Sequence, residues 1–322
     1  MKDTIWTQER IVLALAVLLF GASAVLLHGF LAPDNLISIV RSVSVLGILA
    51  VGMAVVVIGR GIDLSAVAIM AMSAAWYLQM LNDGWSNAAA LATALGGVLA
   101  IGLANGVIIA FADVPAIFAT LASGAVVYGF VRSQLITQES VPLPAGHWLE
   151  AVGKARLATV PAEVFIFAGV AFLAFLLLRF TKWGRYVYYM GDNPMAARNQ
   201  GIPVRIMILL RYVISALVAF AAGLITASSL LSMNTRVVSS TLLYDIILVV
   251  VIGGIGLSGG KGGMRNVIVG ALLIGLLLNA MTILDIPNIY QNLIKATILL
   301  VAIVVDSLLN PRDEQTAQQG DI

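Results

Sequence analysis

The sequence predicts an all-α, polytopic membrane protein with about ten transmembrane helices. Hydrophobic residues make up 61% of the 322 residues, and the mean hydropathy is +1.02. Apolar runs of about 20 residues, the length at which a helix crosses the hydrocarbon core, recur along the chain. A soluble domain could not cover this much apolar surface, so we set aside a soluble enzyme.

The apolar runs predict one transmembrane domain over residues 1–322. The predicted spans are 11–30, 36–59, 66–81, 88–111, 116–136, 162–180, 206–229, 243–256, 267–284 and 289–308. The third and eighth are short, and each adjoins a glycine-rich segment. We expect the first span to be retained rather than cleaved, because no small-residue cleavage site follows it.

The distribution of basic residues predicts the orientation. Cytoplasmic loops are enriched in Lys and Arg, and an even number of spans places 181–205, 257–266 and both tails, 1–10 and 309–322, on one side. The two loops hold Lys182, Arg185, Arg198, Arg205, Lys261 and Arg265. We therefore predict cytoplasmic tails and a cytoplasmic loop at 181–205.

Two segments resemble each other. LANGVIIAFADVPAIFATL (103–121) and LLNAMTILDIPNIYQNLI (277–294) align with a two-residue gap. The matched residues are Asn105, Asp113 and Pro115 with Asn279, Asp285 and Pro287. The predicted topology places the two Asp-x-Pro turns on opposite sides, as an inverted repeat requires. The alternative is a chance likeness between two short apolar segments.

GRGIDLSA (59–66) interrupts an apolar stretch of about 45 residues. Gly61 permits backbone conformations that other residues resist, and Asp63 or Ser65 is suited to cap the following helix. Arg60 and Asp63 would each cost about 3 kcal/mol facing lipid. The segment is therefore either a cytoplasmic turn or a break packed inside the protein.

VVVIGGIGLSGGKGG (249–263) is a second break. It contains a formal G-x-G-x-x-G, but no βαβ unit surrounds it, so we reject dinucleotide binding. A P-loop is also excluded, because Ile255 stands where the first glycine belongs and Gly262 follows Lys261. We predict a tightly packed cytoplasmic turn. The structural residues assigned to this break are Asp245, Gly253, Gly254, Gly259, Gly260 and Lys261.

Other chemistries lack their residues. The chain has no cysteine and two distant histidines, His28 and His147, so neither a thiolate site nor a metal or Ser/His cluster is predicted. Tyr244–Asp245 is half of an intramembrane aspartyl protease pair, but the G-x-G-D partner is missing. There is no basic stripe for nucleic acid. Charges predicted at membrane depth are Arg41, Arg132, Arg211, Asp245, Lys295 and Asp306.

The polar segment YYMGDNPMAARNQGIPV (188–204) has the signals of a short helix. Asn193 is a preferred N-cap residue, Pro194 suits the first helical position, and Gly201 suits the C′ position. We predict a capped cytoplasmic helix at 191–201, between the sixth and seventh spans.

Four blocks in this order and spacing resemble the permease subunits of bacterial ABC importers for ribose and related sugars. They are GRGIDLSAVAIMAM, DVPAIFATLASG, KWGRYVYYMGDNPMAARNQGIPV and LLYDIILVVVIGGIGLSGGKGG. The likeness covers about residues 11–308. The sequence departs from the family at Ala66–Val67 and at Ile246–Leu248, where larger side chains replace small ones.

The resemblance implies a multi-pass protein of the bacterial inner membrane, embedded in the lipid bilayer. A second permease subunit, identical or different, completes the translocation path. Separate cytoplasmic ATPase subunits bind ATP and Mg²⁺, so we expect this chain to bind no cofactor and to have no catalytic site. A periplasmic or lipid-anchored binding protein delivers the solute, which in the family is a pentose, a hexose, autoinducer-2 or a nucleoside.

The resemblance also assigns candidate residues. The polar helix becomes the contact with the ATPase, through Arg185, Gly191, Asn193, Pro194, Ala196, Ala197, Arg198, Gly201 and Ile202. An ordinary loop helix is the alternative. Candidates for the substrate path are Asn105, Phe118, Thr120, Ser123, Asn234 and Asn279. An ion-coupled secondary transporter is the competing function, because broken helices and buried charges suit it as well.

Overall fold

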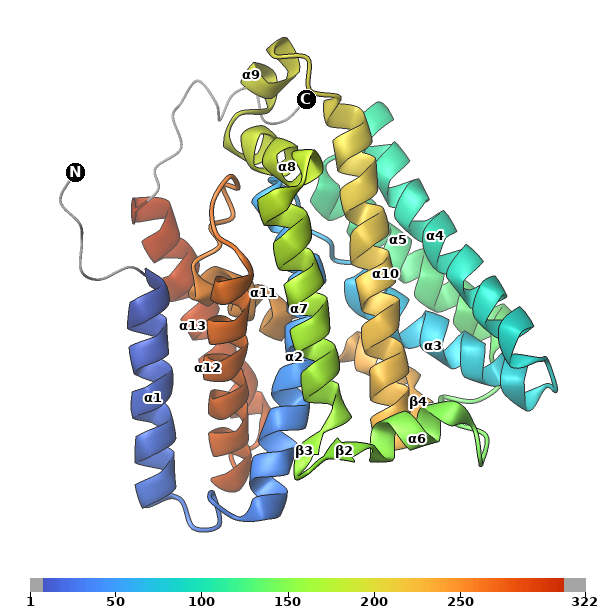
Figure 1. Cartoon of the computed structure of the whole chain (residues 1–322), viewed down its shortest axis with the longest axis vertical. Helices are drawn as coiled ribbons and strands as arrows, with labels where there is room; N and C mark the ends of the chain where they lie inside the picture. Colours follow the sequence, from blue (N-terminus) through green and yellow to red (C-terminus); the bar gives the residue numbers. More distant parts are fainter. Residues whose placement is uncertain (1–7, 310–322) are drawn as a thin grey trace.

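The computed structural model describes residues 8–309, which form a bundle of apolar helices (Figure 1). In this part of the chain, eight helices are long and apolar enough to cross a membrane, and two shorter apolar helices accompany them. The long ones are α1 (Gln8–Leu26), α2 (Pro33–Ile58), α4 (Asn87–Phe111), α5 (Ala116–Phe130, continued by a π turn Val131–Leu135), α7 (Ala162–Phe180), α10 (Val204–Leu230), α12 (Met264–Ile283) and α13 (Asn288–Leu309).

The two shorter apolar helices are α3 (Ala66–Asn82) and α11 (Leu242–Gly253). They correspond to the third and eighth predicted spans. All ten predicted spans are therefore apolar helices in the structure, and the two that were expected to be short are the two short ones. Residues 8–10 and 309 of the predicted tails belong to α1 and α13. The rest of both tails lies outside the described residues.

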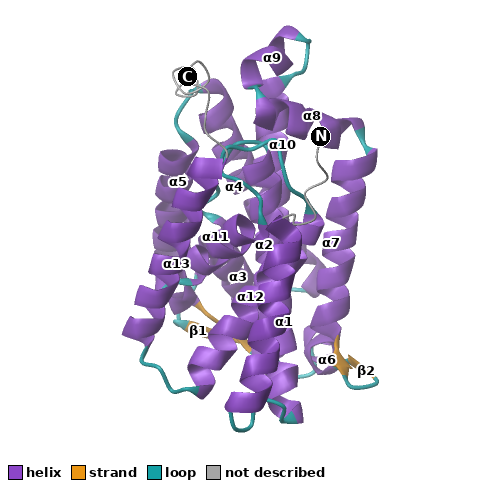
Figure 2. Ribbon diagram, turned by 90° about the vertical axis from the view of Figure 1, so that its left-hand side faces the viewer, coloured by secondary structure: helices purple, strands orange, loops and turns teal. Residues whose placement is uncertain are grey.

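Short elements mark the two ends of the bundle (Figures 1 and 2). At one end, α8 (Lys182–Asp192) and α9 (Pro194–Asn199) join α7 to α10; we refer to this as the α8 end. At the other, the α6 end, lie α6 (Trp148–Lys154), β1 (Ser140–Pro142), β2 (Arg156–Leu157), β3 (Val160–Pro161), β4 (Ser232–Asn234) and a 3₁₀ turn (Thr235–Ser239).

The strands at the α6 end were not predicted. β1 pairs antiparallel with β4, with Ser140 opposite Asn234, and β2 pairs antiparallel with β3. The β1–β4 pair joins the loop after α5 to the loop after α10, and Arg236 forms an ion pair with Glu139 beside it at 2.7 Å. These strands have only two or three residues, too few to leave an alternating pattern in the sequence.

The core is built around α2. Every residue from Leu46 to Gly59 is buried, and the helix packs against α7, α10, α11 and α12. A helix that is apolar on all sides is stable only when surrounded, and the run of α2 has this composition. α10 is the second central helix. It packs closely on α4 because Gly102 and Gly106 have no side chain where the backbones of Val213 and Leu209 approach.

The helix order supports the inverted repeat. α2 to α5 and α10 to α13 are each a long helix, a break, a short helix and two further helices. α10 packs on α3 and α4, and in the same way α2 packs on α11 and α12. α2 runs towards the α8 end and α10 runs away from it (Figure 1). Asp113 and Asp285, at matched positions, both have left-handed backbones, with φ of 51° and 50°.

Candidate coupling site at the α8 end

The three capping signals predicted for the polar helix are all present. Asn193 is the N-cap of α9, and its Oδ1 accepts a 2.9 Å hydrogen bond from the backbone N–H of Ala196. Pro194 is the first residue of the helix, and Gly201 has a φ of +77° shortly after its end. A left-handed glycine at this position ends a helix without steric strain.

The predicted boundaries of this helix were wrong. Gly191 belongs to α8, and α9 spans six residues, Pro194–Asn199, rather than 191–201. The residue before a proline is disfavoured in the helical region, and Asn193 is extended, with φ −147° and ψ 101°. The chain therefore bends between two helices. α8 was not predicted as a helix; its cap is Thr181, whose Oγ1 accepts from the N–H of Gly184 at 3.0 Å.

Three segments meet at one backbone junction. The N–H of Gly260 donates a 2.7 Å hydrogen bond to the carbonyl oxygen of Ile58, the last residue of α2. Gly191 of α8 packs on the same two groups so closely that a Cβ there would overlap the Ile58 carbonyl oxygen. We define Ile58, Gly191 and Gly260 as the glycine junction. It joins three segments that lie far apart in the sequence: the end of α2, α8 and the glycine-rich loop.

The glycine-rich loop that supplies Gly260 is folded through left-handed backbone. Gly254, Gly259 and Gly260 have φ values of +100°, +80° and +74°. Gly253 packs on the backbone of Asn266 at the start of α12. The hydroxyl of Tyr188 in α8 donates a 2.8 Å hydrogen bond to Gly262, and burial raises the pKa of this tyrosine. The predicted tightly packed turn is confirmed.

One face of α9 is buried against the rest of the chain. Ala197 and Ile202 are buried with Met190 and Met207 in a small apolar cluster. The exposed face of α9 carries Met195, Ala196 and Arg198. Arg185 of α8 is also exposed. Ala197 and Ile202, two of the expected ATPase contacts, therefore touch the chain's own residues.

The break at 59–65 is packed inside the protein, which decides between the two interpretations. Asp63 is completely buried and accepts hydrogen bonds from the N–H and hydroxyl of Ser65 and, at 2.7 Å, from the hydroxyl of Ser215 in α10. Ser65 occupies the N-cap position of α3 but makes no side-chain cap bond. The predicted capping by Ser65 is therefore wrong, because its hydroxyl bonds Asp63 instead. Asp63, in contrast, accepts the backbone N–H of Ser65 directly before α3.

Two expected substrate-path residues help to hold this break. The amide nitrogen of Asn105 donates to the hydroxyl of Ser65 at 3.0 Å, and the hydroxyl of Thr120 accepts from the N–H of Leu64 at 3.0 Å. Both are buried. Gly61 packs against the hydroxyl of Tyr212, where a Cβ would lie 2.8 Å away. The break thus fixes α3 against α4, α5 and α10.

The remaining substrate-path candidates are dispersed. Asn234 caps the 3₁₀ turn by accepting from the N–H of Arg236 at 2.9 Å. Asn279 pairs with Asn35, through bonds of 2.7 and 3.3 Å between their amides. Phe118 is exposed and Ser123 half-buried, both on α5. The structure does not bring the six candidates together, and their role in the path stays a prediction.

Charges at membrane depth have partners that the sequence did not identify. Asp245 of α11 forms an ion pair with Lys295 of α13, and Arg41 forms one with Glu163 at 3.4 Å. Arg211 donates to the carbonyl oxygens of Val56 and Gly59 and closes the end of α2. Because an unpaired charge in lipid is costly, the sequence alone could have indicated that each of these charges needs a partner.

Comparison with known proteins agrees with this architecture. Residues 35–303 match the family described as branched-chain amino acid transport system / permease component. The chain is 33% identical over 307 residues to the ribose import permease protein of Escherichia coli K12, covering 94% of each chain. It is also 33% identical to the L-arabinose ABC transporter permease protein of Azospirillum brasilense, over 90% of this chain and 85% of the relative. No solved structure matches.

The bundle of apolar helices, with its paired buried charges, defines a multi-pass membrane protein. The family match and the relatives are more specific: the chain belongs to the permease family of ABC importers, whose members lie in the bacterial inner membrane. The galactofuranose transporter permease of Escherichia coli K12, 33% identical over 84% of this chain, is another relative. These relatives are transport permeases, not enzymes.

Proposed function

We propose that this chain forms the translocation path of an ABC importer for a sugar or sugar-like solute. The relatives transport ribose, L-arabinose and galactofuranose by their names. A second permease subunit, a binding protein at the α6 end and ATPase subunits at the α8 end complete the assembly. ATP and Mg²⁺ belong to the ATPase subunits, and this chain binds no cofactor.

The glycine junction is the observation that carries the mechanism. A cytoplasmic ATPase drives transport only if its movement reaches the membrane helices without being lost in a flexible loop. Gly191 and Gly260 contact the end of α2 directly, and α2 is the most buried of the eight long helices. Because closely packed interiors shift as units, a displacement of α8 moves the end of α2 with it.

The displacement continues into the break at 59–65. This segment follows directly after α2, and its hydrogen bonds reach Ser215 in α10 and Thr120 in α5. Movement of α2 therefore changes the position of α3 and α5 relative to α10. Phe118 and Ser123 of α5 are the path candidates that such a movement exposes or covers.

The exposed face of α9 is the contact with the ATPase. Met195 and Ala196 provide an apolar surface, and Arg198 beside them provides charge that fixes the orientation of the partner. Ala197 and Ile202 lie on the buried side and hold α9 against the rest of the chain. The helix thus has a buried side for rigidity and an exposed side for recognition.

Reconstitution tests this function. The chain, its ATPase subunits and its binding protein are placed in vesicles, and uptake of a panel of labelled sugars is measured with ATP inside or outside. We expect uptake that requires both the ATPase and ATP on the α8 side. Uptake without ATP that collapses with an ionophore would instead support the ion-coupled transporter.

A further inference from the structure

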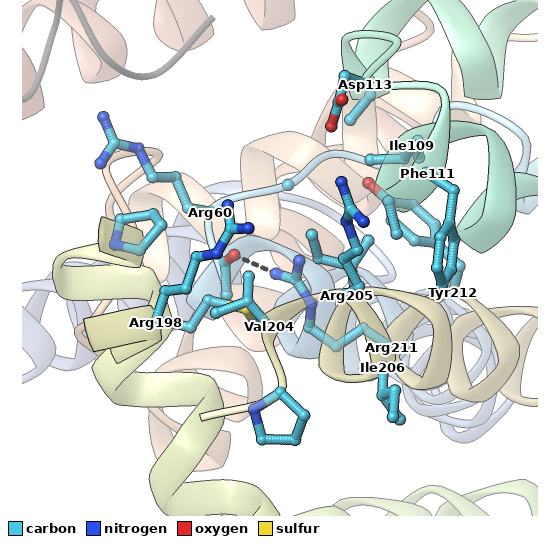
Figure 3. A pocket seen from close by; sticks show the side chains of 18 of the residues that line it. Arg60, Ile109, Phe111, Asp113, Arg198, Val204, Arg205, Ile206, Arg211 and Tyr212 are labelled. Carbon is cyan, nitrogen blue, oxygen red and sulfur yellow. Dashed lines mark hydrogen bonds between the residues drawn. The ribbon is translucent and has the colours of Figure 1, made fainter. Parts of the chain in front are cut away.

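A cavity of about 950 Å³ lies at the α8 end, between α9, the start of α10 and the turn from α4 to α5 (Figure 3). Its charged lining is one-sided: four arginines and, among the described residues, a single carboxylate. These residues are Arg60, Arg198, Arg205, Arg211 and Asp113. We refer to this cavity as the arginine pocket. Its net charge attracts anions, and its size suits a small ligand.

Arg211 makes the pocket more than a charged surface. The side chain is 3% exposed, and its Nη1 donates to the carbonyl oxygens of Val56 and Gly59. Its Nε is buried and has no hydrogen-bond partner within residues 8–309. In the same part of the chain, no carboxylate forms an ion pair with it. A buried guanidinium without a counter-charge is costly, and an anion in the pocket would supply that charge.

Arg198 and Arg205 add two exposed guanidinium groups from separate elements. The guanidinium carbon of Arg205 lies 5.4 Å from the ring centre of Phe111, which holds it at the wall of the pocket. Neither guanidinium group has a hydrogen bond or an ion pair with the residues described. In Figure 3 the guanidinium groups of Arg198, Arg205 and Arg211 are directed towards the middle of the pocket, whereas Arg60 is turned away.

We propose that the arginine pocket binds a phosphate-bearing anion through Arg198, Arg205 and Arg211. Planar guanidinium groups donate paired hydrogen bonds that match phosphate oxygens, and three of them surround one group from different directions. The anion is either a soluble phosphate compound or the headgroup of an anionic lipid. Anion binding itself does not depend on the proposed transport function, because every residue belongs to this chain, whereas the effect of the anion on transport rests on that function.

The position of the pocket gives the bound anion a regulatory role. Arg198 lies on α9, whereas Arg205 and Arg211 lie on α10. An anion held by all three arginines links α9 to α10, which the break at 59–65 also contacts. A bound phosphate therefore restrains α9 and slows the movement that the ATPase imposes. The level of phosphate compounds, or of anionic lipid, then sets the rate of transport.

The first experiment uses the full chain purified in neutral detergent without anionic lipid. Binding of inorganic phosphate is measured by calorimetry at constant ionic strength, with chloride as the reference anion. We expect the double variant Arg198→Gln/Arg205→Gln to bind phosphate at least about ten-fold more weakly than the natural chain. The matched control Arg179→Gln, an exposed arginine of α7 outside the pocket, should bind as the natural chain does.

A second experiment distinguishes the two sources. The natural chain and the double variant are placed in bilayer discs of phosphatidylcholine with phosphatidylglycerol, and retained lipid is measured by native mass spectrometry. Selective loss of phosphatidylglycerol from the double variant, without phosphate binding in detergent, assigns the pocket to a lipid headgroup. Phosphate binding that the double variant loses assigns it to a soluble anion. Equal behaviour of both chains with both probes overturns the proposal, whatever the uptake measurements give.

Discussion

The Nζ of Lys295 lies 2.9 Å from the Oδ1 of Asp245, and both side chains are less than 10% exposed. The same nitrogen donates to the hydroxyl of Thr241 at 2.6 Å. The pair joins α11 to α13 within the apolar bundle, where a lone charge would have neither water nor counter-ion. Each residue therefore lowers the free-energy cost of burying the other's charge at this depth.

Asp245→Asn should destabilise the chain by about 3–5 kcal/mol, because it leaves the Lys295 cation buried without its counter-charge. The double variant Asp245→Leu/Lys295→Met removes both charges and should recover most of that loss. Unfolding by heat or denaturant in detergent measures the stability of the two variants. A double variant as unstable as Asp245→Asn would mean that the pair contributes more than mutual neutralisation.

Gly191→Ala should uncouple ATP hydrolysis from uptake. The added methyl group overlaps the carbonyl oxygen of Ile58, so α8 must move away from the end of α2. We expect uptake to fall by about ten-fold or more while the ATPase still binds, a loss of at least about 1.4 kcal/mol of coupling. Gly169→Ala in α7 is the matched control, because a Cβ there meets nothing within 4 Å. Normal uptake by the Gly191 variant would exclude the glycine junction from coupling.

Substitutions at two neighbouring alanines distinguish docking of the ATPase from packing of α9 on the chain. Ala196→Glu places a charge on the exposed face of α9 and should abolish ATPase binding without changing the stability of the isolated chain. Ala197→Glu buries that charge in the apolar cluster below α9 and should dislodge the helix, with local destabilisation of about 1–3 kcal/mol. Co-purification of the ATPase and hydrogen exchange over residues 182–210 measure the two effects. Identical behaviour of both variants would contradict the two-sided assignment of α9.

His147 should make the α6 end sensitive to acid. Its Nδ1 accepts a hydrogen bond from the N–H of Leu149 and caps α6, which requires the neutral ring. Burial lowers the pKa of His147 below its ordinary value of 6.5. In the unfolded chain the ring takes up a proton first, so stability is complete above that value and declines as the pH falls below it.

Hydrogen exchange of the α6 amides, measured between about pH 8 and about pH 5, tests this prediction. Protection corrected for the intrinsic exchange rate should decrease towards the acid end. His147→Asn keeps a capping acceptor but removes the titrating ring, so its protection should not follow this pH dependence. Persistence of the same dependence in that variant would assign it to another group.

The ten apolar helices followed from the sequence, because the length of a hydrophobic run is a local property that can be compared directly with the thickness of a bilayer. Even the short helices α3 and α11 were visible, since GRGID and GGIGLSGG interrupt their runs. The caps of α9 were visible for the same reason, because Asn193 and Pro194 act on adjacent residues.

The junctions could not be read in the same way. Nothing in the sequence distinguishes Gly191 and Gly260 from other glycines until the backbone of Ile58 is placed beside them, and Gly191 comes 133 positions after Ile58 in the chain. Ser215, which bonds Asp63, carries no local signal either. Asn105 and Thr120 suggested a polar path, but polar groups in apolar surroundings bond to their nearest neighbours first, and here the nearest neighbour is the break.

The central place of α2 also sets the order in which the protein matures during synthesis. This helix emerges from the ribosome near the beginning, yet the helices that enclose it, α7, α10, α11 and α12, are made in the second half of the chain. Until then, α2 contacts only lipid or insertion factors at the surfaces that these helices will cover. The native core therefore forms late, and a chain terminated before α12 leaves its central helix unprotected and exposed to quality-control proteases.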